Sequence, residues 1–382
     1  MKTYDVVIVG GGIIGSSIAL ELSKRNVRVA VLERGEFMRE ASWAAAGMLS
    51  PAPSFPDWIP LVPLGRASLG LYPHFIPDVE DTSGKKTGYR TTGTLEVLFH
   101  GDVERELSTL VALHHGLGLA CEPISIDEAL VMEPALGREA RAAAFLPDEA
   151  SVDPRALAEA VLAAAKTGGA TMLSGMEVTS LTQEGNRCTG VQTAEGETFV
   201  AKHVVVAAGS WTSQLKQATP YAPTTPVRGQ VVALLNAGQL IHSVLRTEYG
   251  YIVPRNQASP QKLVAGSTLE HVGYEKAITS GGMEQILSTV NEIAPGLACA
   301  KIVETWCGLR PGTPDQLPIL GPTDVEGLLL ATGHYCNGIL LAPITAKLIA
   351  EYITEGKPSM EIKDFSPMRF LAENSDCSAT AS

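Results

Sequence analysis

Residues 4–15 read YDVVIVGGGIIG, and this stretch decides the fold. The Val- and Ile-rich run Tyr4–Val9 predicts a strand buried on both faces of a parallel sheet. After the glycines, Ile13–Lys24 has apolar residues at the spacing of one helix face. Val27–Leu32 predicts a second buried strand that ends at Glu33. Together these segments form a βαβ unit of about thirty residues.

The glycines of this unit match the pattern GxGxxG, which in this context predicts a dinucleotide site. Gly10 would permit the tight turn, Gly12 would let the backbone approach a pyrophosphate, and Gly15 would let the helix pack closely on the strand. The helix N-terminus supplies N–H groups and partial positive charge for the phosphates. The Glu33 carboxylate is placed to accept hydrogen bonds from the ribose hydroxyls. The motif alone is compatible with both NAD and FAD.

Two later segments favour a long cofactor held by both ends of the chain. Residues 203–209, HVVVAAG, predict a buried strand that ends in small residues. Residues 331–338, ATGHYCNG, follow the last strand and precede a helix that starts near Ile339, so that Pro343 falls in its first turn. Small residues would let a flat cofactor lie near the backbone. The helix N-terminus would stabilise negative charge on a reduced flavin, which favours FAD.

Length and composition bound the remaining possibilities. The chain has 382 residues, 45% apolar and 18% charged, which indicates a globular protein of two or three domains or one large cofactor-binding fold. The net charge of −12 disfavours nucleic-acid binding. The six cysteines include no CxxC pair, so a zinc site or disulfide framework is disfavoured and a cytoplasmic location is expected. The most apolar stretch, residues 328–349, contains polar residues and Pro343, so no membrane span is expected.

The middle of the chain combines irregular and regular segments. Residues 34–90 are rich in Gly, Pro and Ala, and prolines at 51–63 predict long irregular stretches without a continuous helix. Asp153 and Pro154 predict a helix start, and that helix is expected to end near Gly168. Further predicted segments are a strand over 91–99, a helix over 103–117, short strands over 171–206, an antiparallel sheet over 226–268, a helix over 283–293 and a frayed tail after Arg369.

At this point the sequence resembles the FAD-dependent D-amino acid oxidase superfamily, and within it the glycine oxidases associated with thiamine biosynthesis. The likeness spans residues 3 to about 355, nearly the whole chain. The glycine motif and Glu33 are common to many flavoproteins, whereas GLRPGT and NGILLAP are much more specific to glycine oxidases. The stretches that carry the resemblance are Gly10–Gly15, AAAGML at 44–49, YIVPR at 251–255, GLRPGT at 308–313 and GH with NGILLAP at 333–343.

The resemblance implies an α/β fold with a Rossmann-like, glutathione-reductase-like FAD-binding domain and an inserted antiparallel-sheet α+β substrate domain. The FAD-binding domain would comprise residues 1–86, 149–219 and 308–370, and the substrate domain residues 87–148 and 220–307. Residues 371–382 would form a flexible tail. A homo-oligomer is the family expectation.

The resemblance also assigns site residues. Arg310 would grip the substrate carboxylate, which its two parallel N–H donors match, and Tyr251 would line the amino-acid pocket. Gly308 would lie at the same catalytic site, and no metal is implied. The residues expected to bind FAD are Gly10, Gly12, Ile13, Ile14, Gly15, Glu33, Arg34, Ser42, Ala45, Ala46, Gly47, Met48, Val178, Ala208, Gly209, Trp211, Gly308, Arg310, His334, Tyr335, Cys336, Asn337, Gly338, Ile339 and Leu340.

The implied reaction is oxidative deamination of glycine or another small amino acid by hydride transfer to flavin. The products are a 2-oxo acid, ammonia and, with dioxygen as acceptor, hydrogen peroxide. His334 is expected to make a structural hydrogen bond rather than to act as a base. The alternatives are a D-amino acid dehydrogenase or a sarcosine (N-methyl amino acid) oxidase of the same superfamily, an NAD-dependent dehydrogenase, and a flavin-binding protein without catalysis.

One residue departs from the family pattern. Some relatives carry an Arg where this chain has Cys336, so a second cation near the carboxylate is missing and the preferred substrate is open. Neither Cys336 nor Cys307 lies in a motif of covalent flavin attachment, and inert thiols are expected at both positions.

Overall fold

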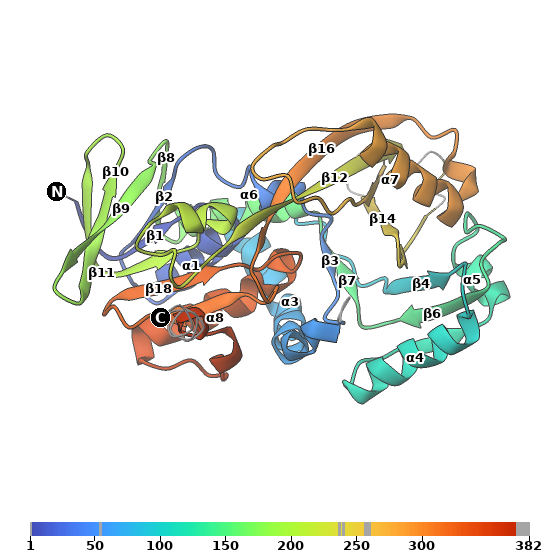
Figure 1. The fold of residues 1–382 in the computed structure, drawn as a ribbon, viewed down its shortest axis with the longest axis horizontal. Helices are drawn as coiled ribbons and strands as arrows, with labels where there is room; N and C mark the ends of the chain where they lie inside the picture. Colours follow the sequence, from blue (N-terminus) through green and yellow to red (C-terminus); the bar gives the residue numbers. More distant parts are fainter. Residues whose placement is uncertain (1, 53–55, 236–237, 239–240, 256–260, 372–382) are drawn as a thin grey trace, which may run out of the picture.

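The computed structural model describes residues 2–52, 56–235, 238, 241–255 and 261–371, and it consists of two lobes, each built on an eight-stranded sheet (Figure 1). The mixed α/β architecture expected from the sequence is confirmed. The first sheet contains β1 (Lys2–Val9), β2 (Val29–Glu33), β8 (Thr171–Ser174), β9 (Val178–Glu184), β10 (Arg187–Thr193), β11 (Thr198–Val206), β17 (Ile319–Pro322) and β18 (Leu328–Thr332).

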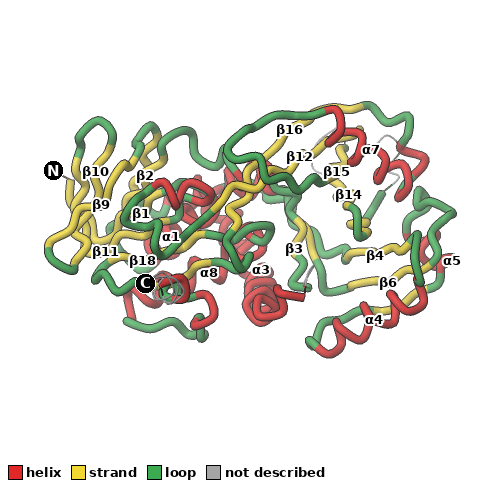
Figure 2. Tube along the Cα trace, viewed as in Figure 1, coloured by secondary structure: helices red, strands yellow, loops and turns green. Residues whose placement is uncertain are grey.

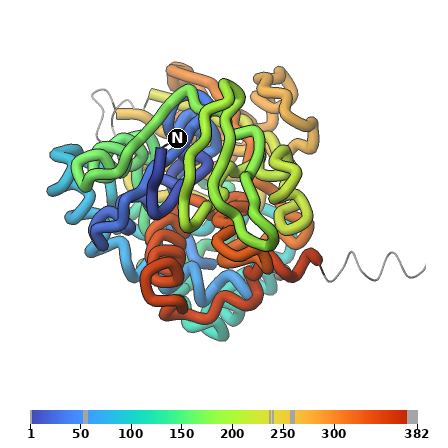
Figure 3. Tube along the Cα trace, turned by 90° about the vertical axis from the view of Figure 1, so that its left-hand side faces the viewer, coloured from blue at the N-terminus to red at the C-terminus, as the bar shows by residue number. Residues whose placement is uncertain are grey.

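The first sheet has a parallel centre with apolar layers on both faces. Its order is β17-β18-β11-β1-β2-β8, and all neighbours are parallel except β17 and β18. Val6 and Ile8 of β1 face the helical side, and Val7 and Val9 face the opposite side. The strands β9 and β10 extend from β11 and cover that second face (Figure 3). The expected strand buried on both faces is therefore confirmed.

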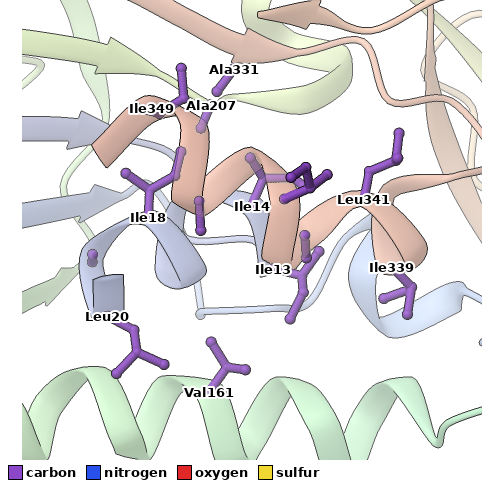
Figure 4. Close-up of a cluster of buried hydrophobic side chains, with 14 of the residues drawn as sticks. Ile13, Ile14, Ile18, Leu20, Val161, Ala207, Ala331, Ile339, Leu341 and Ile349 are labelled. Carbon is purple, nitrogen blue, oxygen red and sulfur yellow. The ribbon is translucent and has the colours of Figure 1, made fainter. Parts of the chain in front are cut away.

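Four helices cover the other face. They are α1 (Ile13–Lys24), α3 (Val62–Ser83), α6 (Pro154–Thr167) and α8 (Gly338–Glu355). The α1 helix lies between α8 and α6, and Ile13, Ile14 and Ile18 fill the space between them (Figure 4). The expected Asp153 cap is present, since its carboxylate accepts from the N–H groups of Arg155 and Ala156. The glycine turn before α1 is thus held between a parallel sheet and a helical layer.

The helix α3 corrects the expectation of a mostly irregular segment over residues 34–90. It contains Pro73 and Pro77 in its interior and Pro63 in its first turn. An interior proline removes one helical hydrogen bond but does not prevent a helix whose buried face is otherwise regular. That face recurs about every four residues, at Leu64, Ser68, Tyr72, Ile76 and Val79. Packing of this stripe outweighs the cost of the prolines.

The helix α8 also differs from the expectation, because it begins at Gly338 and Pro343 lies beyond its first turn. The missing N–H of Pro343 would leave the carbonyl of Ile339 without its helical donor. The buried Tyr72 hydroxyl of α3 donates to that carbonyl instead, at 2.5 Å. The Ser68 hydroxyl donates to the next carbonyl, that of Leu340. The helix that the sequence did not predict therefore supports the start of α8.

The second sheet is mostly antiparallel, with the order β16-β12-β15-β14-β13-β4-β6-β5. It carries α4 (Val103–Gly116), α5 (Ile126–Met132) and α7 (Ser280–Ile293), seen at the right of Figures 1 and 2. The strands are β4 (Thr94–Leu98), β5 (Glu122–Ile124), β6 (Ala142–Leu146), β12 (Thr225–Leu235), β13 (Val244–Thr247), β14 (Gly250–Arg255), β15 (Lys262–Gly266) and β16 (Ile302–Gly312).

The lobes are connected by the long pair β12 and β16 and by two short elements, α2 (Ala41–Ala44) and the ribbon β3 (Met48–Leu49) with β7 (Ala150–Ser151). The predicted domain boundary at residue 308 falls inside β16, whose pairing with β12 continues to Gly312. The division into domains stays a prediction. Most of the predicted tail, residues 372–382, lies outside the described residues. None of the described helices is both long and apolar enough to cross a membrane.

Candidate active site

A first cavity of about 340 Å³ lies at the carboxyl ends of β1, β2, β11 and β18. Gly10 turns the chain there with a φ of 108°, and a Cβ on it would lie 2.4 Å from the Ala207 carbonyl oxygen. A Cβ on Gly15 would lie 2.1 Å from the Gly10 carbonyl oxygen. Both contacts are closer than any side chain tolerates, so the turn requires glycine at these positions.

The N-termini of two helices face this cavity. Gly12 precedes α1 and Asn337 precedes α8; neither of these two residues caps its helix with its own side chain, and neither helix has an acidic residue in its first turn. In α1 the Ser42 hydroxyl accepts from the Ile13 N–H at 2.9 Å. Uncapped helix N-termini present N–H donors and partial positive charge. The cavity is therefore suited to an elongated ligand that carries negative charge in two places.

Polar side chains close the end of the cavity near β2. Glu33 accepts from the N–H groups of Gly11 at 2.8 Å and Gly35 at 2.9 Å, which holds its carboxylate in the wall. The Arg34 guanidinium lies 4.0 Å from the centre of the Trp211 ring and pairs with Glu40. This end thus offers a carboxylate for hydroxyl groups and a cation–aromatic stack at the rim.

Most of the predicted FAD-binding residues line this first cavity. They are Gly10, Gly12, Ile13, Ile14, Glu33, Arg34, Ser42, Ala45, Val178, Ala208, Gly209, Trp211, His334, Tyr335, Cys336, Gly338 and Ile339. Gly15 and Leu340 do not line it but pack behind it. Ala46, Gly47, Met48, Gly308, Arg310 and Asn337 line a second cavity.

The lining residues that sequence reasoning missed include two groups outside the motifs. Met176, Glu177 and Thr179 flank Val178 at the start of β9, and Gln214 and Leu215 end the turn after Gly209. The second group follows directly on a predicted strand end, and that position could have indicated it. No local signal marks Met176, Glu177 and Thr179, because only the tertiary fold brings them to the cavity.

A second cavity of about 600 Å³ adjoins the first. The two share Ala41, Ala45, Tyr335, Cys336 and Ile339 as lining residues, so one leads into the other. The predicted catalytic residues Arg310, Tyr251 and Gly308 all line the second cavity. The fold therefore brings the predicted substrate residues next to the predicted cofactor residues. No group of three or more metal-ligating side chains occurs within the part of the chain that is described.

Arg310 is a cation without a carboxylate partner among the described residues. Its Nη1 donates to the Thr268 carbonyl at 3.1 Å and its Nη2 to the Ser267 hydroxyl at 2.7 Å. The other N–H donors of the guanidinium stay available to a ligand. Gly229 leaves the space that the guanidinium occupies, because a Cβ there would lie 2.2 Å from Nη1. An unpaired guanidinium in a cavity wall is suited to binding a carboxylate.

Four titratable groups that line the two cavities are neutral at neutral pH. Burial raises the pKa of Tyr251, although the Arg310 charge opposes this rise, and burial also raises the pKa of Cys336. Burial raises the pKa of Tyr335 to about 12. Burial lowers the pKa of His334 to about 3, and its Nε2 lies 3.0 Å from the Thr345 hydroxyl. The hydrogen bond expected for His334 is therefore present.

The wall between the cavities is braced across the two lobes. The Trp306 indole donates to the Ala44 carbonyl at 3.1 Å, and a Cβ on Gly308 would lie 2.4 Å from the Cβ of Ala44. Arg155 makes a bidentate pair with Glu304 and lies over the Trp306 ring. These contacts hold α2 against β16, and only a glycine fits at position 308.

Comparisons with known proteins agree with this geometry. A family model described as DAO, FAD dependent oxidoreductase, matches residues 5–352. The bifunctional protein ThiO/ThiG of Trichormus variabilis is 36% identical over 379 residues, which cover 98% of this chain and 56% of that protein. The chain thus spans about half the length of this relative. The glycine oxidase of Geobacillus kaustophilus is 33% identical over 374 residues, which cover 97% of this chain and 98% of that protein.

Solved structures of glycine oxidases have the same fold as this chain. The crystal structure of the Geobacillus kaustophilus glycine oxidase superposes with a TM-score of 0.91 at 32% identity, covering 97% of this chain and 99% of that one. The glycine oxidase of Bacillus cereus superposes with a TM-score of 0.88 at 32% identity, covering 95% and 98%.

Proposed function

Because the chain belongs to the DAO family of FAD-dependent oxidoreductases, we propose that it oxidises glycine or another small amino acid to the 2-oxo acid, ammonia and hydrogen peroxide. The observation that carries this proposal is the unpaired Arg310 guanidinium in a cavity that opens onto the dinucleotide site. A guanidinium there selects a carboxylate, and the adjoining cavity places the rest of the ligand next to the cofactor.

The residues of the first cavity fit FAD. The glycine turn at Gly10–Gly15 and the α1 N-terminus would hold the pyrophosphate, Glu33 would hold the ribose of the adenosine half, and the α8 N-terminus would face the flavin ring. FAD, when bound, accepts two electrons and a proton from the substrate C–H bond and passes the electrons to dioxygen or another acceptor.

The residues of the second cavity would position the substrate. Arg310 would hold the carboxylate, while Ser267 and Thr268 fix the orientation of the guanidinium. The Tyr251 hydroxyl lies beside Gly266, in the same row of the sheet, and would add a hydrogen bond. Holding both ends of a small molecule in this way lowers the entropy cost of reaching a reactive geometry.

None of the side chains of Tyr251, His334, Tyr335 and Cys336 is suited to removing a proton at neutral pH. The raised pKa values of Tyr251, Tyr335 and Cys336 and the lowered pKa of His334 keep all four groups neutral. The substrate would therefore react as the free amine, whose lone pair forms the imine that water then hydrolyses. The protein contributes binding, orientation and exclusion of water.

The alternatives within the superfamily differ in the bond that is oxidised or in the electron acceptor. Cys336 supplies a neutral thiol where some relatives carry a cation, which leaves Arg310 to bind the carboxylate alone. A sarcosine-type oxidase would release formaldehyde from the N-methyl group, and a D-amino acid dehydrogenase would not produce hydrogen peroxide.

Location and assembly are part of the proposal. The five cysteines in the described part of the chain are free thiols, which supports a reducing, cytoplasmic compartment. A homo-oligomer follows from the family resemblance, and light scattering after size exclusion measures it.

Product analysis tests the proposed reaction. The purified holoprotein is incubated with glycine in air, and glyoxylate, ammonia and hydrogen peroxide are measured. Equal amounts of the three support the proposal. Formaldehyde from sarcosine with no turnover of glycine would instead support the N-methyl oxidase.

A further inference from the structure

The second cavity continues beyond Tyr251 along the substrate sheet. The strand register places Gly266, Tyr251, Arg246 and Glu96 side by side on the neighbouring strands β15, β14, β13 and β4. Residues directly opposite each other in register point to the same face of a sheet. Arg246 and Glu96 both line the cavity. A row of polar side chains therefore leads away from the predicted reaction site.

This far part of the cavity carries an excess of negative charge. Arg246 is enclosed between two carboxylates, since it pairs with Glu96 and with Glu149, which lies 3.2 Å from its Nη1. The side chains of Glu96 and Glu149 are only 13% and 5% exposed. Glu248, also in the cavity wall, has no cationic partner among the described residues. Arg246 thus contributes one positive charge to this region, against the negative charges of Glu96 and Glu248 in the cavity wall and of Glu149 behind it.

A buried acceptor without a partner lies in the same wall. His114 of α4 lines the second cavity and is 2% exposed. Its Nδ1 lies 2.8 Å from the Leu110 carbonyl, and because a carbonyl only accepts, Nδ1 carries the proton. In the neutral ring Nε2 is therefore an acceptor, and it has no hydrogen-bond partner among the residues that the structure describes. A buried acceptor left unpaired is costly. Nε2 exposes less than 1 Å² of surface, so a ligand donor would reach it through a small turn of the imidazole ring toward the cavity that His114 lines.

We propose that the part of the second cavity lined by Glu96, Arg246, Glu248 and His114 is a subsite for a cationic, hydrogen-bond-donating group at the far end of the substrate. The inference rests on the proposed function, since Arg310 anchors the carboxylate at the near end. An ammonium group suits this subsite because it balances the excess carboxylates and donates to Nε2. The cavity volume of about 600 Å³ gives a substrate larger than glycine the room to reach it.

Binding of unreactive probes tests the subsite. The probes are ω-amino acids, namely 4-aminobutanoate, 5-aminopentanoate and 6-aminohexanoate, each compared with the alkanoate of the same chain length. None carries an α-amine, so each can bind at Arg310 without being oxidised. Their dissociation constants are measured on the FAD-loaded protein from the change in flavin absorbance. At the best length we expect the ω-amino acid to bind about tenfold more tightly than its alkanoate, the effect of one charge-assisted hydrogen bond.

Two variants locate the charge. Glu248→Gln removes a carboxylate from an exposed position, and Glu96→Gln keeps an acceptor for Arg246 while removing the excess charge. Each is expected to reduce the preference at least about threefold. Glu104→Gln is the matched control, because Glu104 is exposed on the same helix as His114 but outside the cavity, and it is expected to leave the preference unchanged.

The outcomes separate this inference from the proposed function. Equal or tighter binding of the alkanoate at every length would overturn the subsite, because an apolar cavity disfavours an ammonium group. A preference that survives both carboxylate substitutions would also overturn it. If glycine is oxidised without any such preference, the subsite alone fails. If the preference holds but no amine reduces the flavin, the proposed reaction alone fails.

Discussion

Substitution of Gly229 tests the role of Arg310 without removing its charge. A Cβ at position 229 would lie 2.2 Å from Nη1 and 2.4 Å from Cζ and Nη2 of Arg310. Real carbon contacts do not fall below about 3 Å, so in Gly229→Ala the guanidinium must retreat by about 1 Å. That movement breaks its hydrogen bonds to Ser267 and Thr268. Only the flexible end of one side chain has to move, so the variant is expected to fold.

The expected result is a fall in kcat/KM for glycine of about 100-fold, or about 2.7 kcal/mol, because a misplacement of about 1 Å at a substrate clamp has an effect of that size. Most of the change should appear in KM, and FAD should remain bound. Steady-state oxygen consumption measures both parameters. In an Arg310→Ala background the same substitution should have no further effect, since no guanidinium is left to displace. Unchanged kinetics in Gly229→Ala, or an equal loss in both backgrounds, would refute the reasoning.

Three further predictions concern the framework of the site. Tyr72→Phe should lower the free energy of unfolding by about 1–3 kcal/mol, because it leaves the buried carbonyl of Ile339 unpaired. Adding Pro343→Ala should recover most of this loss, because alanine restores the helical N–H. Chemical denaturation of the wild-type protein, the two single variants and the double variant measures this, and additive losses would contradict it. Burial lowers the pKa of His334 to about 3, so between pH 3 and about 6.5 the unfolded state binds one more proton than the folded state. The free energy of unfolding should therefore fall by up to about 1.4 kcal/mol per pH unit as the pH drops through this window. This slope should be smaller in His334→Gln, and identical slopes in the two proteins would contradict the assignment. Gly308→Ala places a methyl group 2.4 Å from the Cβ of Ala44, so it should lower the free energy of unfolding by about 1–3 kcal/mol, lower the melting temperature and weaken FAD retention. A wild-type melting temperature and wild-type FAD retention would show that α2 moves freely.

Most of the residues that the sequence predicts to bind the cofactor line one cavity, because the signals there are local. The turn at Gly10–Gly15 needs its glycines for reasons visible within one βαβ unit, and the helix over Ile13–Lys24 has the predicted bounds. GLRPGT and NGILLAP are short, continuous motifs, and the first residues of each, 308–311 and 337–339, line the two cavities. The prediction of FAD rested on these motifs and is confirmed by the family match.

The failures arise where distant segments decide the structure. Prolines suggested an irregular segment, but the apolar stripe of α3 packs on α8, and Tyr72 replaces the hydrogen bond that Pro343 cannot make. The far subsite was invisible in the sequence, because Glu96 and Arg246 are brought together by strand register across 150 residues of chain. Pairing between distant strands is not encoded in any local pattern.

The most direct test of the proposed function is an anaerobic titration of the FAD-loaded protein with glycine, followed by flavin absorbance. We expect glycine to bleach the oxidised flavin band of the wild-type protein, and Arg310→Ala to need a far higher glycine concentration for the same bleaching while retaining its flavin. An oxidised band that persists in the wild-type protein at saturating glycine, sarcosine and D-alanine would contradict the proposal that this chain is a small-amino-acid oxidase.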